Sequence, residues 1–219
     1  MRLEVWMAYT DKTKFISDYN EAHKAVMEMK VPDSVPVSPE TAFEFYCASF
    51  ALKTTQVNAN GEAVPPLQIF GRLFLDDAAN RISVRELRET TGITLYEWQN
   101  FNSLKLNDWN MAINDTWLLS GVNSLQPFYA ASLVNKENII DARFTPPLTI
   151  MGREFAGLAL AGYQEASTHP ILGKAYAHAP GNEKKAHDLG FRDYAKGLSQ
   201  LKTVADVEKL FSDAKFTID

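Results

Sequence analysis

The chain has 219 residues, of which 46% are hydrophobic and 22% are charged, and its formal net charge is −5. These values are typical of folded globular proteins and exclude disorder as the default state. The mildly acidic balance disfavours a broad nucleic-acid or anionic-membrane surface, which needs clustered Lys and Arg. The single cysteine, Cys47, excludes an intrachain disulfide and a zinc site built mainly on thiolates.

The N-terminal part predicts one strand followed by two helices. Residues 2–9 alternate apolar side chains with more variable ones, as a strand does. Apolar residues recur at spacings of three and four over 12–30, which predicts a helix that ends at a proline-rich segment. A second helix is expected from Pro39, because Ser38 suits the N-cap and proline suits the first helical position.

The segment 56–66, QVNANGEAVPP, is the clearest loop in the chain. We therefore expect a single domain over residues 1–219, with a subdivision near 56–66 as the alternative. Residues 67–75, LQIFGRLFL, follow this loop and predict a mostly buried strand.

Two helix-start patterns follow in tandem within residues 83–106. SVRE and TLYE each place Ser or Thr three residues before Glu, as in a capping box. A Gly-containing turn separates the two predicted helices, and this order is also that of a DNA-binding helix-turn-helix. Residues 94–104 contain no Lys or Arg, which disfavours nucleic acid as the partner but leaves it as an alternative.

The C-terminal half predicts mostly helices and one further extended segment. The extended segment is 126–133, and the predicted helices are 107–124, 151–165, 183–198 and 203–214. Because strands do not alternate regularly with helices, the expected fold class is α+β, predominantly helical with a small sheet.

No membrane segment is predicted. The best candidate is FAGLALAGY, residues 155–163, which as a helix covers about 14 Å, against roughly 30 Å of hydrocarbon. The N-terminal apolar run is short and interrupted by Glu4, which does not fit a signal peptide. We therefore expect a cytoplasmic protein.

Three of the four histidines, His169, His178 and His187, stand nine residues apart. On one continuous helix this spacing turns the chain by about 900° and leaves neighbouring histidines on opposite faces. The spacings HxxxH, HxH and HExxH are absent, so we predict no metal site, with His169 and His178 in a loop. Cys47 stands well inside its predicted helix among aromatic residues, which indicates a packed, inert thiol.

Four residues are candidates for a binding site: Trp109, Asp115, Trp117 and Arg153. NDWNMAIND sets Trp109 and Trp117 beside two aspartates on a predicted helix, which suits a polar and aromatic contact patch. The alternative is that both tryptophans belong to the core. Arg153 and Glu154 precede an apolar helix and suit either charge recognition or a solvated first turn.

No phosphate loop, dinucleotide fingerprint or nucleophile elbow occurs in the chain, and no cofactor is predicted. The leading hypothesis is a non-catalytic, cytoplasmic, bacterial-like protein that binds another macromolecule, expected to be a protein, in an accessory or immunity-type role. The first alternative is an enzyme whose site is assembled from dispersed residues such as Asp76, Asp108 and Asp115 with His169 or His178. The second is the helix-turn-helix DNA-binding protein.

Overall fold

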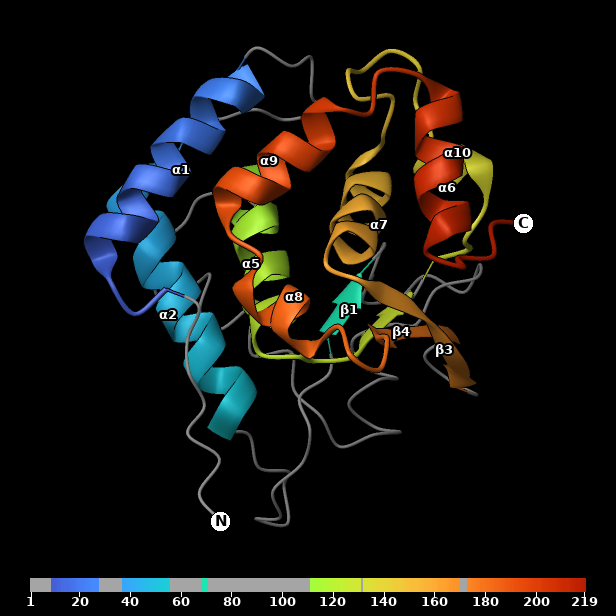
Figure 1. Ribbon diagram of the computed structural model, residues 1–219. Helices are drawn as coiled ribbons and strands as arrows, with labels where there is room; N and C mark the ends of the chain where they lie inside the picture. Colours follow the sequence, from blue (N-terminus) through green and yellow to red (C-terminus); the bar gives the residue numbers. More distant parts are fainter. Residues whose placement is uncertain (1–8, 28–36, 56–67, 71–110, 131, 170–172) are drawn as a thin grey trace, which may run out of the picture.

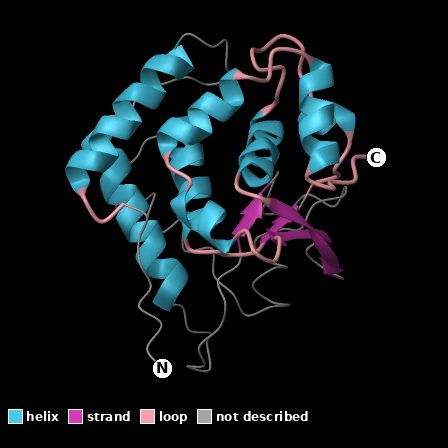
Figure 2. Cartoon of the chain, in the orientation of Figure 1, coloured by secondary structure: helices cyan, strands magenta, loops and turns pink. Residues whose placement is uncertain are grey.

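The computed structural model of the protein describes residues 9–27, 37–55, 68–70, 111–130, 132–169 and 173–219. Over these residues the chain forms eight helices and a four-stranded sheet. The fold class is therefore α+β and predominantly helical, as predicted from the sequence. Figure 2 shows the strands gathered at one end of the helices.

Helices make up most of the described chain. Three lie in its first part: α1 (Lys12–Met27), α2 (Pro39–Thr55) and α5 (Met111–Asn123). Five lie in its last part: α6 (Lys136–Ile139), α7 (Ile150–Leu160), α8 (Glu183–Asp188), α9 (Phe191–Ser199) and α10 (Val204–Asp213). Helix α7 packs against both α5 and α9, and α9 also packs against α1 (Figure 1). None of the helices in these segments is long and apolar enough to cross a membrane.

Polar side chains at the helix starts explain where several helices begin. The Ser38 hydroxyl accepts a hydrogen bond of 3.1 Å from the backbone N–H of Thr41, which confirms the predicted cap of α2. Thr203 and Asp206 form a capping box at the start of α10, where a helix over 203–214 was predicted. Thr149, which the sequence analysis did not single out, caps α7 through the N–H of Gly152 at 2.9 Å.

The sheet has the strand order β1-β2-β4-β3. Its members are β1 (Gln68–Phe70), β2 (Phe128–Ala130), β3 (Tyr163–His169) and β4 (Gly173–His178). β1 runs parallel to β2, with Gln68 opposite Phe128, whereas β2–β4 and β4–β3 are antiparallel. The predicted strands 67–75 and 126–133 therefore exist over the residues of β1 and β2.

The prediction of one helix over 151–165 is wrong at its C-terminal end. Helix α7 ends at Leu160, and Gly162 then adopts a φ of +81°, which glycine accepts without strain. The chain continues directly into β3. Residues 166–168 of this strand are all exposed, so buried apolar and exposed polar side chains do not alternate along it. The sequence pattern therefore gives little indication of a strand here.

The predicted helix 183–198 is also wrong as a single helix, because it is divided into α8 and α9. Leu189 is extended, and Gly190 precedes the first residue of α9. The Tyr9 hydroxyl lies at this break, where it accepts a hydrogen bond of 2.8 Å from the N–H of Phe191. The Asn123 side chain donates to the carbonyls of Ala186 and Leu189, at 3.0 Å each, and so satisfies the end of α8.

Aromatic side chains form much of the core. Phe15 of α1 lies edge-on to Phe191 of α9 with 5.2 Å between ring centroids, and Tyr46 of α2 lies 5.6 Å from Phe15. Phe155 of α7 meets Tyr176 of β4 edge-on at 4.9 Å. Each of these side chains is almost fully buried, so the aromatic residues join the helices to one another and to the sheet.

Several predictions fall on residues outside the described segments. These are the strand over 2–9 apart from Tyr9, the tandem helices within 83–106 and the boundary near 56–66. The single-domain organisation over residues 1–219 therefore stays a prediction.

The substitution Asn123→Ala should lower the free energy of unfolding by about 2–4 kcal/mol, because two buried carbonyls and the Tyr46 hydroxyl each lose a hydrogen-bond partner. Asn138→Ala is the matched control, since Asn138 makes a similar hydrogen bond to the Leu133 carbonyl at an exposed position. The control should cost less than about 1 kcal/mol. Urea unfolding followed by circular dichroism measures both, and equal losses would contradict the role assigned to Asn123.

Candidate functional site

Asp115 and Arg153, two of the predicted binding residues, meet in a buried ion pair. The Arg153 side chain of α7 donates from Nε and Nη2 to the two oxygens of Asp115 in α5, at 2.9 and 2.7 Å. Tyr194 of α9 donates from its hydroxyl to Asp115 Oδ1 at 2.8 Å. One carboxylate thus connects three helices through charge-assisted hydrogen bonds.

The interpretation of Arg153 and Glu154 as a solvated first turn is wrong. Arg153 is 2% exposed and Glu154 is 4% exposed, because α7 lies between α5 and α9. Close packing at two glycines holds α7 there: a side chain at Gly152 would collide with the Ile139 carbonyl, and one at Gly157 with Leu118. Arg153 tolerates burial because Asp115 supplies a geometrically matched countercharge.

Burial and the Asp115 charge shift the pKa values in this group. Burial is the largest single effect and acts to lower the pKa of Arg153, but the charges and hydrogen bonds of Asp115 and Tyr194 together outweigh it and raise that pKa. Burial raises the pKa of Tyr194 well above its ordinary value, and Asp115 adds to the effect. Burial also raises the pKa of Glu154 to about 8, with repulsion from Asp115 adding to it and the Asn114 side chain opposing it.

Nη1 of Arg153 and Oε2 of Glu154 have no hydrogen-bond partner within the described part of the chain. Arg153 and Asp115 neutralise one another, whereas Glu154 has no cationic partner among the described residues. The arrangement therefore holds one compensated ion pair beside a carboxyl group whose pKa burial raises, which favours its protonated form.

The structure describes only one of the two candidate tryptophans, Trp117. Trp117 is 3% exposed and packs edge-on against Phe128 with 5.5 Å between ring centroids, so the structure places it in the core. Trp109 lies outside the described residues. A binding role for Trp109, Asp115, Trp117 and Arg153 stays a prediction.

The three histidines lie in three elements. His169 ends β3 and His178 ends β4, so the interpretation of both as loop residues is wrong. His178 Nδ1 lies 3.8 Å from a carboxylate oxygen of Glu183, and His187 Nδ1 lies 2.9 Å from the Asn123 carbonyl oxygen. Across the described segments, no group of three or more His, Cys, Asp or Glu side chains could hold a metal ion.

The structure describes only some of the dispersed residues named in the enzyme hypothesis. Asp115 binds Arg153 and Tyr194, whereas His178 lies beside Glu183. Asp76 and Asp108 lie outside the described residues. Cys47 is half-buried in α2, and burial raises the pKa of its thiol, which keeps it in the less reactive form.

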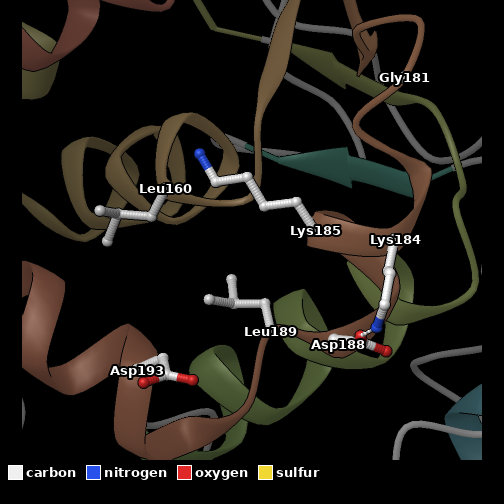
Figure 3. Close-up of a pocket in the computed structure, with 7 residues that line it drawn as sticks. All are labelled: Leu160, Gly181, Lys184, Lys185, Asp188, Leu189 and Asp193. Carbon is white, nitrogen blue, oxygen red and sulfur yellow. Dashed lines mark hydrogen bonds and ion pairs between the residues drawn. The ribbon is translucent and has the colours of Figure 1, made fainter.

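An open depression lies on the surface where the end of α7 faces α8 and α9. Its cavity volume is about 590 Å³, and its lining residues are Leu160, Gly181, Lys184, Lys185, Asp188, Leu189 and Asp193. In Figure 3, Leu160 and Leu189 lie between Lys185 on one side and Asp193 on the other. Lys184 is occupied by an ion pair with Asp188.

The charges of this depression are not all paired. Lys185 and Asp193 are exposed and form no ion pair with any residue that the structure describes. Nothing in the sequence connects Lys185 with Asp193 or with the two leucines, because Lys185 and Asp193 stand in a segment predicted as one continuous helix. The depression depends on the break between α8 and α9, which the apolar periodicity of 183–198 does not reveal.

Comparisons with known proteins find no matching family, no matching curated protein and no matching solved structure.

The Asp115–Arg153 pair should behave as a coupled unit in a double-mutant cycle. Arg153→Met and Asp115→Asn should each cost about 3–5 kcal/mol of unfolding free energy, because each single change leaves a buried ionic partner uncompensated. The double variant should cost clearly less than the sum of the two single changes. Denaturant unfolding of all four proteins gives the coupling energy.

The exposed pair Lys209–Asp213 is the control, changed in the same way to Met and Asn. Its coupling energy should stay below about 1 kcal/mol. If the losses of unfolding free energy in the two single variants of the Asp115–Arg153 pair add up to the loss in the double variant, the two side chains are not coupled.

Proposed function

We propose that the protein acts by binding another protein, and that the depression between α7, α8 and α9 is the contact surface. The observation that carries the proposal is an apolar floor of Leu160 and Leu189 with charges of opposite sign, Lys185 and Asp193, on its two sides, neither of which pairs with another described residue. Interfaces combine a desolvated apolar centre with a polar rim in this manner.

The shape of the depression favours a protein segment over a small molecule. Small-molecule sites are concave enough to bury most of the ligand surface. This depression is open to solvent along α8 and α9, and charged side chains supply most of its lining residues. A partner that covers the whole depression can exclude water from the leucines while it satisfies both charges.

The charges define the complementary partner. Lys185 attracts a carboxylate and repels a cation, and Asp193 has the opposite preference. The occupant is therefore a segment of a partner protein with an acidic and a basic side chain on either side of an aliphatic one. The two charges also set the direction in which such a segment lies.

The proposal extends to a non-catalytic, accessory or immunity-type role in the cytoplasm. It is supported by the buried charges of Asp115 and Arg153, which are engaged with one another within the fold. The enzyme and DNA-binding hypotheses remain the alternatives, since residues 71–110, for which the sequence predicts the tandem helices, lie outside the described part.

Immobilised protein should capture a stoichiometric partner from lysate of its native cells, and Lys185→Glu or Asp193→Lys should weaken that capture. We expect a loss of roughly tenfold in affinity for each, because reversal replaces an exposed attraction of about 1 kcal/mol by repulsion. Quantitative mass spectrometry and titration with the identified partner measure the loss.

Two charge reversals at other exposed positions serve as controls: Lys202→Glu, before α10, and Glu137→Lys, in α6. Capture that is equal for all variants would overturn the assignment of the depression. The absence of any stoichiometric partner would overturn protein binding itself. Capture that disappears after nuclease treatment would favour the DNA-binding alternative.

A further inference from the structure

Glu154 occupies a position in which its carboxylate form has no compensation. The neighbouring guanidinium of Arg153 is already engaged through two nitrogens by Asp115. Among the described residues Glu154 Oε2 has no hydrogen-bond partner, and the side chain is almost fully buried. Ionisation would therefore place an uncompensated negative charge between packed helices, next to a second carboxylate.

We propose that Glu154 is a proton-dependent latch, which must keep its proton for α5, α7 and α9 to stay closed around the Asp115–Arg153 pair. In its neutral form the carboxyl group is tolerated in the interior. In its ionised form it repels Asp115 and favours conformations in which α7 separates from α5 and α9 and water reaches the carboxylate.

The groups around Glu154 support this direction of response. From α5 it faces Asn114 and Asp115, and from α9 it faces the hydroxyl of Tyr194, whose pKa it helps to raise. None of these three groups supplies a positive charge. Helices α6 and α10 and strand β3 also pack against α7. Lys136 of α6 pairs with Glu208 of α10 at 2.6 Å, and Glu165 of β3 accepts from the N–H of Thr217 at 3.0 Å, so these three charged groups are engaged away from Glu154.

The latch reaches the depression through the same helices. Leu160 is the last residue of α7, and Asp193 immediately precedes Tyr194 in α9. Gly197 of α9 approaches Leu160 so closely that a side chain there would lie 2.6 Å from its Cδ1 atom. Separation of α7 from α9 thus changes the depression, and this last step alone rests on the proposed function.

Linkage sets the pH range. The carboxyl group of Glu154 has a pKa of about 8 in the closed state and an ordinary value of 4.5 when exposed. Between these values the open state releases a proton that the closed state keeps, so opening becomes more favourable as pH rises. The opening constant should increase by about tenfold per pH unit within this interval and level off above pH 8.

Hydrogen exchange of the protein alone tests the latch. Protection factors of the α7 and α9 amides, corrected for the intrinsic exchange rate and measured from pH 5 to 9, should fall by about tenfold per unit and then level off. Glu154→Gln, which keeps the shape but cannot ionise, should remove this slope. Glu137→Gln, at an exposed position of α6, should retain it. An unchanged slope in Glu154→Gln would overturn the proposal.

A second measurement needs no variant. In protein labelled with ¹³C at glutamate Cδ, one carboxyl carbon should titrate near pH 8, well apart from the exposed glutamates. If all glutamates titrate below pH 6, the latch does not exist. Neither measurement involves a partner, so failure of the latch and failure of the docking proposal are separate results.

Discussion

The ion pair between Asp115 and Arg153 is the constraint on which the arrangement of the C-terminal helices depends. It joins α5 to α7 in the interior, and the Tyr194 hydroxyl of α9 donates a hydrogen bond to the same Asp115 carboxylate. A buried ion pair contributes little net stability when compared with apolar residues of the same volume. The ion pair instead fixes how the helices are arranged, because only one register of α5, α7 and α9 brings the five atoms of these hydrogen bonds together.

The close contacts at glycines follow from that register. Gly157 brings α7 against Leu118 and Tyr194, and Gly152 brings its first turn against the Ile139 carbonyl. Once α7 is set at this distance, Arg153 and Glu154 have no path to solvent. The same geometry that satisfies Arg153 therefore imposes burial on Glu154, and the high pKa of Glu154 is a consequence of where its neighbour must lie.

Local chemistry made much of the fold predictable from the sequence. The Ser38 cap and the Thr203–Asp206 capping box act within four residues, so they are visible in one stretch of sequence. The β3 strand was missed because its exposed residues 166–168 leave no apolar alternation, whereas the division between α8 and α9 was missed because a distant residue lies at it. The break at Gly190, for example, is occupied by Tyr9, which stands 182 residues before its hydrogen-bond partner Phe191.

The buried charges were hidden for the same reason. Asp115 and Arg153 stand 38 residues apart, and each by itself is typical of a solvated helix face. Both were singled out from the sequence, but their pairing and the burial of Glu154 appear only when α5 and α7 are packed together. The surface depression depends in part on this packing, since Leu160 ends α7 and Asp193 lies in α9, two helices that the Asp115 contacts connect. A change of protonation deep in the interior can therefore alter a surface that it does not touch, because the same helices form both.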